Sequence, residues 1–395
     1  MALLLSAGCG AAPVSAADWP GWRGPSRNGI SPETGLQWSW PAEGPKVLWK
    51  GVVGKGFSSF AVVQERVYTM GNQDNTDTVF CLEAATGRVI WRHSYPCPLD
   101  PLAHEGGPGS TPAVQDNRIY TISKAGHLFC LEAAGGRVIW SAKLEAPPTT
   151  KEDYKVWWGF HGSPLVSGDL LLVAAGTAGM AWDKVTGKIV WDNGPGRSGY
   201  SSPVPFPSGA EPGFAFLSGH EVVAAEVKSG RALWKIPWRT TWDQNASDVV
   251  IAENKLFVST GHGVGCALFD LASGKPVQVW RNKNLRSELS SAVRWNGCLY
   301  GYDEKRLTCL DWRTGGVKWV LDDSRQGSLS LADGKLIALE ENGLLRIVEA
   351  TGEACKPVAA APILGGRCWT VPVLADGRLL ARNALGEVVC LNLRK

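Results

Sequence analysis

One thirteen-residue phrase occurs twice in the chain, and it constrains the fold more than any other feature. Residues 79–91 read VFCLEAATGRVIW and residues 128–140 read LFCLEAAGGRVIW. Degraded copies follow at 181–191, 224–234 and 309–319, and in all five copies a tryptophan stands four residues after a glycine. A unit that cannot bury its own apolar faces must stack against its copies. The chain is therefore predicted to be an array of repeats.

Each copy predicts a β-hairpin. An apolar run is followed by Asp or Glu, a turn ending in Gly, and a second apolar run, which is the pattern of a hairpin. The glycine accepts the positive φ of the turn, and the carboxylates of Glu83, Glu132, Asp183 and Asp311 are expected to accept backbone N–H groups across it. A further strand pair precedes each hairpin. Each unit thus predicts four antiparallel strands, and their nearly continuous apolar runs predict burial of both sheet faces.

The length of the unit and the two chain ends predict how the sheets close. A period of about 40–45 residues is typical of a β-propeller. The chain ends on CLNLRK, the first half of the phrase, whereas its second half, KVLW with Trp49, stands near the N-terminus. A blade shared between the termini removes exposed sheet edges. We therefore predict an all-β fold over 46–395, an eight-bladed β-propeller of four-stranded antiparallel blades whose last blade is closed by an N-terminal strand, in preference to seven blades or an open solenoid.

Composition excludes several classes of function. The net charge of +3 is spread without blocks, so nothing predicts nucleic acid or an anionic membrane as a partner. No run of about 18 apolar residues is present, so no transmembrane segment is predicted. The sequence has no CxxC, HExxH, GxSxG or Walker motif, and His262 with Cys266 is a weak metal hint that is more typical of turn and strand residues. No metal site is expected.

The ten cysteines favour packing over redox chemistry. Cys81, Cys130, Cys309 and Cys390 occupy one position of the repeat, directly before a leucine. A residue that recurs at one structural position is most simply a small buried apolar side chain, and equivalent positions in different repeats are too far apart for a disulfide.

Residues 1–17 are typical of an export signal. Leu3–Leu5 form a short apolar run, and small residues before Ala17 offer a cleavage site, although a basic start is missing. The stretch ending at Cys9 also resembles a lipoprotein box, so a cleaved signal and a lipid anchor at Cys9 both remain open. We expect an exported protein in the periplasm or envelope.

Residues 18–45 are expected to form a leader that packs on the propeller. Two tryptophans, Trp19 and Trp22, stand in its first part, DWPGWRGPSRNGISPE. We expect them to lie along the outer surface of the ring, and not to recognise a partner.

The repeated phrase resembles the tryptophan-docking motif of pyrroloquinoline-quinone (PQQ)-like repeat propellers, roughly Ala-x-Asp-x-x-Thr-Gly-x-x-x-Trp. Ala181, Asp183, Thr186, Gly187 and Trp191 match it in full. The resemblance implies that the tryptophan of one blade packs against the backbone of the next, and it assigns this structural role to Trp49, Trp91, Trp140, Trp191, Trp234, Trp280 and Trp319. The family contains quinoprotein dehydrogenases that use PQQ and calcium and a scaffold for outer-membrane protein assembly, so it implies no single function.

Functional groups are expected in the loops that lead into the innermost strands, because these loops ring one mouth of the central channel. Their Gly-Ser pairs are explained by eight strands that converge on one axis. Larger residues just before those pairs are predicted to face a common funnel, where Arg and Lys suit carboxylates or phosphates and Trp offers a stacking face; the alternative is that they are merely solvated. The predicted funnel residues are Lys55, His104, Glu105, Trp158, His161, Arg197, Tyr200, Trp242, Asp243, Asn245, Arg286, Glu288, Arg325, Gln326, Arg367 and Trp369.

The leading hypothesis is an exported propeller that acts as a non-catalytic binding or assembly scaffold without a cofactor, with an envelope protein or a small ligand at its mouth. The rival is an oxidoreductase that uses PQQ with calcium or another small molecule in the funnel. The resemblance implies an adjacent cysteine pair for that chemistry, and no two cysteines are adjacent; Asp243 and Glu288 are candidate bases without known partners. A sugar-binding or carbohydrate-active protein is supported only by Trp158, Trp242 and Trp369 at the mouth.

Overall fold

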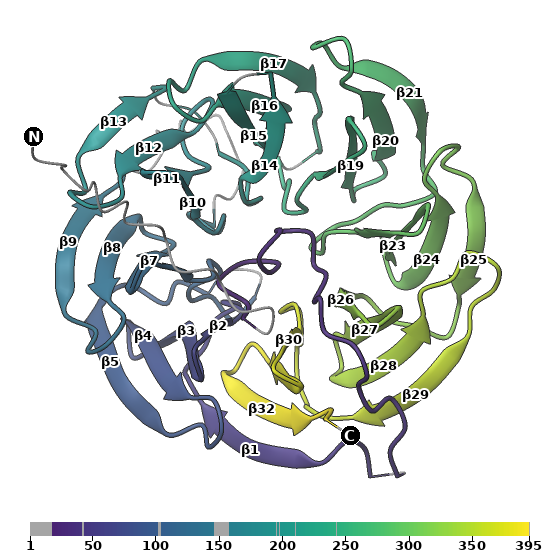
Figure 1. Ribbon diagram of the computed structural model, residues 1–395, viewed down its shortest axis with the longest axis horizontal. Coiled ribbons are helices and arrows are strands. Elements are labelled where there is room, and N and C mark those ends of the chain that lie inside the picture. The colour runs from purple at the N-terminus through teal and green to yellow at the C-terminus, as the bar shows by residue number, and fades with distance from the viewer. Residues whose placement is uncertain are drawn as a thin grey trace, which may run out of the picture.

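In the computed structural model the chain forms a ring of eight β-sheets around a central axis (Figure 1). The structure describes residues 18–394 apart from 42, 102–103, 146–157, 195, 197, 210 and 242. Every sheet has four strands, and consecutive strands pair antiparallel. The predicted all-β, eight-bladed propeller is confirmed, and the alternatives of seven blades and an open solenoid are wrong. The predicted export signal and the lipid anchor at Cys9 lie outside the described residues.

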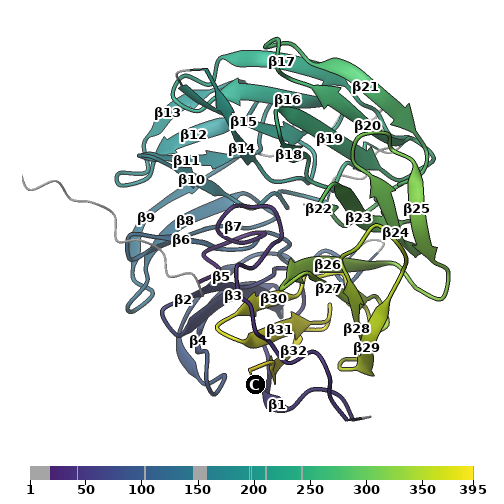
Figure 2. The ribbon, with the colours of Figure 1, turned by 45° about the vertical axis from the view of Figure 1, so that its right-hand side comes forward.

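The four strands of each blade follow one another from the axis to the rim (Figure 1; Figure 2 gives a turned view). Blades 1 to 4 comprise β2 (Ala61–Val63), β3 (Arg66–Gln73), β4 (Thr76–Glu83) and β5 (Val89–Pro96); β6 (Ala113–Gln115), β7 (Arg118–Ile122), β8 (His127–Glu132) and β9 (Val138–Lys143); β10 (Leu165–Ser167), β11 (Leu170–Val173), β12 (Met180–Asp183) and β13 (Ile189–Asp192); and β14 (Val204–Ser208), β15 (Glu211–Leu217), β16 (Glu221–Glu226) and β17 (Ala232–Pro237). Blades 5 to 7 comprise β18 (Val250–Ala252), β19 (Lys255–Thr260), β20 (Gly265–Asp270) and β21 (Val277–Asn282); β22 (Val293–Trp295), β23 (Cys298–Asp303), β24 (Arg306–Asp311) and β25 (Val317–Leu321); and β26 (Gly327–Ala332), β27 (Lys335–Glu340), β28 (Leu344–Glu349) and β29 (Pro357–Pro362).

Blade 8 joins the two ends of the chain. It comprises β30 (Val373–Ala375), β31 (Arg378–Arg382), β32 (Glu387–Asn392) and, as its outermost strand, β1 (Val47–Val52). Trp49 lies opposite Cys390 in the β1–β32 pair, so the two half-phrases of the sequence meet in one hairpin. The described part of the chain contains no helix long and apolar enough to cross a membrane.

Hydrophobic cores lie between neighbouring blades. Tyr68 and Cys81 of blade 1, for example, pack with Ile119 and Leu131 of blade 2. The prediction for the repeated cysteines is confirmed, because Cys81, Cys130, Cys309 and Cys390 are fully buried free thiols. Each is paired with a tryptophan across the outer hairpin, namely Trp91, Trp140, Trp319 and Trp49.

The outer-strand tryptophans bond to the following blade. The indole N–H of Trp91 donates to the carbonyl of Ala133 at 3.0 Å, and a Cβ on Gly136 would lie 2.5 Å from the same ring. Gly136, at φ 74°, is therefore required by the turn and by the close approach of the indole. The same indole bond joins Trp49 to Ala84, Trp140 to Lys184, Trp191 to Val227, Trp280 to Trp312 and Trp319 to Thr351. The close glycine contact is absent at two described positions: nothing lies within 4 Å of a Cβ on Gly274, in the blade after Trp234, and a Cβ on Gly352 would meet Lys318 and Cys298 instead of Trp319.

The hydrogen-bond partner of each turn carboxylate depends on the length of its side chain. Asp183 accepts the N–H of Thr186 at 2.7 Å, and Asp311 accepts the N–H of Thr314 at 2.8 Å, as predicted. The longer side chain of Glu83 accepts the hydroxyl of Thr86 instead.

The leader crosses the end of the ring at which the innermost strands finish. Trp19 exchanges two backbone hydrogen bonds of 2.7 Å with Val62 at the end of β2, and the N–H of Ser31 donates to Leu331 of β26. Figure 1 shows this segment in dark purple at the centre of the ring. The leader closes one end of the central channel.

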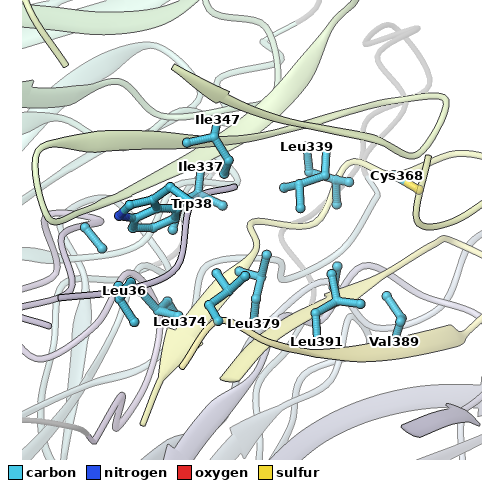
Figure 3. Close-up of a cluster of buried hydrophobic side chains, with 14 residues drawn as sticks. Leu36, Trp38, Ile337, Leu339, Ile347, Cys368, Leu374, Leu379, Val389 and Leu391 are labelled. Carbon is cyan, nitrogen blue, oxygen red and sulfur yellow. The ribbon is translucent and has the colours of Figure 1, made fainter. Parts of the chain in front are cut away.

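Further along, the leader enters the core between blades 7 and 8. Leu36 and Trp38 pack against Ile337, Leu374 and other buried side chains of these blades (Figure 3). The prediction that Trp19 and Trp22 lie on the outer surface is wrong. Trp19 is 1% exposed between blades and Trp22 lies in the channel, because the converging strands leave a space at the axis that the leader fills.

Candidate functional site

A cavity of about 310 Å³ lies at the mouth of the central channel, where the loops before the innermost strands converge. All eight blades and the leader contribute to it. It is lined by Trp22, Phe57, His104, Gly109, Trp158, His161, Ser163, Tyr200, Ser202, Gln244, Ala246, Glu288, Leu289, Gln326, Trp369 and Thr370. Seven predicted funnel residues are brought together here: His104, Trp158, His161, Tyr200, Glu288, Gln326 and Trp369.

One side of the cavity is a continuous series of rings, which we call the aromatic arc: Trp369, Phe57, His104, Trp158 and Tyr200. Trp369 stacks on Phe57 with centroids 5.5 Å apart, and Phe57 meets His104 edge-on at 5.1 Å. His104 lies 5.8 Å from Trp158, which lies 5.8 Å from Tyr200. The five residues come from blades 8, 1, 2, 3 and 4, so five loops of different sequence build one aromatic wall.

The opposite side is polar, and we call it the polar arc: Gln244, Glu288 and Gln326 from blades 5, 6 and 7. The amide Nε2 of Gln326 lies 3.5 Å from Oε2 of Glu288, at the limit of a hydrogen bond. The described lining residues include no Lys or Arg. The described lining residues therefore present aromatic faces opposite the carboxylate of Glu288.

The floor is made by the leader. The indole N–H of Trp22 donates to Oδ2 of Asp248 at 2.6 Å. Arg23, beside it, donates to the carbonyl of Ala292 at 2.7 Å and pairs with Asp248 at 3.9 Å, and the side chains of both ionised groups are only 2% exposed. Burial lowers the pKa of Arg23, and Asp248 opposes that shift. Asp248 thus holds the leader under the cavity.

The Gly-Ser pairs do more than save space around the axis. A hydroxyl or carboxylate at the second position accepts the backbone N–H of the equivalent residue in the preceding blade, which gives a chain of bonds around the channel. The bonds run from Ser59 to Thr111 (3.0 Å), Thr111 to Ser163 (2.9 Å), Ser163 to Ser202 (2.9 Å), Ser202 to Asp248 (2.7 Å) and Asp248 to Ser291 (2.8 Å). Asp248 occupies the serine position in blade 5. Its second carboxylate oxygen accepts the indole N–H of Trp22 from the leader.

The two histidines of the lining are held neutral. Nε2 of His161 lies 2.9 Å from the carbonyl of Trp158, and burial lowers the pKa of His161 to about 4. A Cβ on Gly109 would lie 1.9 Å from the His161 ring, so this approach requires glycine. Nδ1 of His104 accepts the N–H of Gly106, and burial lowers the pKa of His104 as well. Neither imidazole adds a charge to the cavity at pH 7.

Two of the predicted cationic residues, Arg286 and Arg367, form ion pairs outside the described lining. Arg286 makes two bonds to Asp303, at 2.7 and 2.9 Å. Arg367 pairs with Glu105 at 2.8 Å and lies 4.5 Å over the ring of Trp369. Each guanidinium charge is therefore balanced by a neighbouring carboxylate.

The other predicted residues outside the lining have separate positions. Lys55 is exposed and bridges Asn72 through its backbone, and Arg325 is exposed. Asn245 is fully buried and donates to the carbonyl of Ser218 at 2.8 Å, and Asp243 pairs with His220 at 3.2 Å. Arg197 and Trp242 lie outside the described residues.

Sequence reasoning missed four important lining residues. Phe57, Gln244 and Leu289 each lie within two residues of a predicted position, and the Gly-Ser signal marks their loops without saying which side chain faces the axis. Trp22 had no signal, because its partner Asp248 lies 226 residues away.

The described residues of the cavity do not fit PQQ with calcium. PQQ is a planar quinone that carries several carboxylates, which need cationic partners, and the described lining residues offer none. Calcium takes six or more oxygen ligands, whereas the described lining residues include one carboxylate. The described part of the chain has no group of three His, Cys, Asp or Glu suited to a metal. No step can be derived through the quinone here.

The fold and part of the sequence match known proteins. The family described as outer membrane protein assembly factor BamB matches residues 75–321. BamB from Moraxella catarrhalis superposes with a TM-score of 0.65 at 15% identity, over 88% of this chain and 97% of that one. A europium-containing methanol dehydrogenase superposes with a TM-score of 0.73 at 12% identity, over 96% and 98%. The quinohemoprotein alcohol dehydrogenase ADHIIG from Pseudomonas putida HK5 gives 0.65 at 13% identity, over 96% and 80%.

At these identities the structural matches establish the fold alone. No curated protein matches the chain by sequence.

Proposed function

Because the chain belongs to the family described as outer membrane protein assembly factor BamB, a family of PQQ-like repeat propellers, we propose that it is a non-catalytic binding scaffold of the cell envelope whose contact site is the cavity at the channel mouth. The observation that carries the proposal is the composition of the lining, in which all eight blades converge on an aromatic arc opposite a short polar arc. Aromatic residues in a concave site supply large contact areas at low entropic cost.

The chemistry of the lining supports binding over catalysis. A general base needs a partner that orients it and a reacting group within reach. His161 is engaged with the carbonyl of Trp158 and His104 with the N–H of Gly106, so both imidazoles have structural partners. Glu288 is bonded only weakly to Gln326. We propose that these groups position a bound partner and transfer no proton.

We further propose that the protein does not use a quinone cofactor, and a binding experiment tests this. The purified full chain is to be mixed with PQQ and calcium at micromolar concentrations, and tryptophan quenching and the quinone absorbance left after desalting are measured. We expect no retained absorbance, because the described lining residues include no cation for the quinone carboxylates. Retention that is lost in Trp369→Ala would instead assign the cavity to an oxidoreductase and overturn the proposal.

A further inference from the structure

The charge of the cavity points to a particular kind of ligand. The described lining residues carry one carboxylate, Glu288, and no Lys or Arg. Among the described residues, Arg367 pairs with Glu105 and Arg286 with Asp303. Beneath the floor of the cavity, Arg23 pairs with Asp248, and Arg27 donates to the carbonyls of Ser163 and Pro164. The contact of Glu288 to Gln326 is 3.5 Å long. A half-buried carboxylate with a weak neutral contact of this kind is costly to cover with an apolar or anionic ligand.

The aromatic arc also favours a positively charged ligand. The face of an indole or a phenol ring is negative, and it attracts a cation placed within about 6 Å of the centroid. Arg367 shows the effect in this molecule, because its guanidinium lies 4.5 Å over the ring of Trp369. Trp158 and Tyr200 offer further ring surface in the cavity.

We infer that the cavity binds an organic ammonium group, with its positive charge between the aromatic arc and the carboxylate of Glu288. The inference rests on the proposed function, since it names the chemistry of the partner at that site. The two histidines do not oppose it, because burial keeps them neutral at pH 7. A volume of about 310 Å³ accommodates a small ammonium head group and a short tail. The ammonium could be carried by a free small molecule or by a lysine side chain of a partner protein.

The test is a calorimetric titration of the purified full chain at pH 7, with tryptophan fluorescence read in parallel. Choline is compared with 3,3-dimethyl-1-butanol, which has the same shape without the charge. We expect choline to bind at least tenfold more tightly than the neutral alcohol, with a change in fluorescence because the aromatic arc is the binding wall. Nα-acetyl-lysine methylamide forms a second arm, and tighter binding of this compound than of choline would identify a protein lysine as the source of the ammonium.

Two variants locate the site. Glu288→Gln removes the carboxylate, and Leu289→Lys adds a cation to a lining residue that is 37% exposed; each is expected to weaken choline binding about tenfold or more. Glu353→Gln is the matched control, because it removes the same charge from a side chain that is 85% exposed on an outer hairpin, and it should leave binding unchanged. Equal loss in Glu353→Gln would mean that the effect comes from net charge and would overturn the inference.

Two further results would also overturn it. Equal binding of choline and the neutral alcohol would show that the cavity selects shape, and binding of neither ammonium compound would show that it does not take this group. Neither result affects the proposed scaffold function, which fails only if PQQ is retained at the cavity or if no partner contacts the mouth.

Discussion

Asp248→Ala is expected to lower the free energy of unfolding by about 3–5 kcal/mol and to release the leader from the channel. The substitution leaves the buried guanidinium of Arg23 without its carboxylate and takes the acceptor from the indole N–H of Trp22. It also breaks the chain of bonds around the channel at the N–H of Ser202. Breaking a buried charged pair costs more than breaking a neutral hydrogen bond because the remaining charge stays desolvated.

Urea unfolding measures the loss, and limited trypsin digestion reports the leader, since Arg23 and Arg27 are buried in the intact protein. Ser291→Ala is the matched control in the next blade. It leaves only the N–H of Asp248 unpaired and should cost about 1 kcal/mol, with the leader still protected. Equal losses in the two variants, with resistant Arg23 and Arg27, would contradict the assigned role of Asp248.

His161→Gln is expected to reduce the acid sensitivity of the protein. The pKa of His161 is lowered to about 4 by burial, against about 6.5 for an unfolded histidine. Above pH 6.5 both states are neutral and stability is unaffected. As the pH falls from 6.5 towards 4, the unfolded chain takes up a proton that the folded chain excludes, so stability is lost in this window.

The full shift would amount to about 3 kcal/mol, and because His161 is only partly buried by accessible surface we expect about 2 kcal/mol. Urea unfolding at several pH values between 7 and 4.5 should show that wild type loses about this much more than His161→Gln, whose amide can still donate to the carbonyl of Trp158. Parallel pH profiles for the two proteins would rule out His161 as the group excluded from protonation.

The fold could be predicted from the sequence because its determinants are local and repeated. The glycine and the tryptophan four residues apart set one hairpin in each blade, and the half-phrases around Trp49 and Cys390 specify how the ring closes. Burial of Cys81 and its equivalents followed from the same repeat. Such patterns involve residues that are close together in the chain, so they can be recognised without knowledge of the rest of the molecule.

The site could be predicted only in part, because it depends on contacts between distant residues. The converging loops were identified, but whether Lys55 or Phe57 faces the axis depends on the backbone of each loop. Arg286 was expected in the funnel, but its guanidinium donates to Asp303 at the end of β23. The path of the leader along the axis is not part of any repeated motif. The position of Trp22 was therefore predicted wrongly.

The most direct test of the scaffold account is site-specific photo-crosslinking at the mouth. A photoreactive phenylalanine is placed at Leu289 in the lining and, as a control of equal 37% exposure, at Val138 on the outer strand β9. The account predicts a discrete adduct with an envelope component after irradiation of cells only at position 289, and its loss when Trp369→Ala removes part of the aromatic arc. Equal adducts at both positions, or none at position 289, would contradict the claim that this cavity is the contact site.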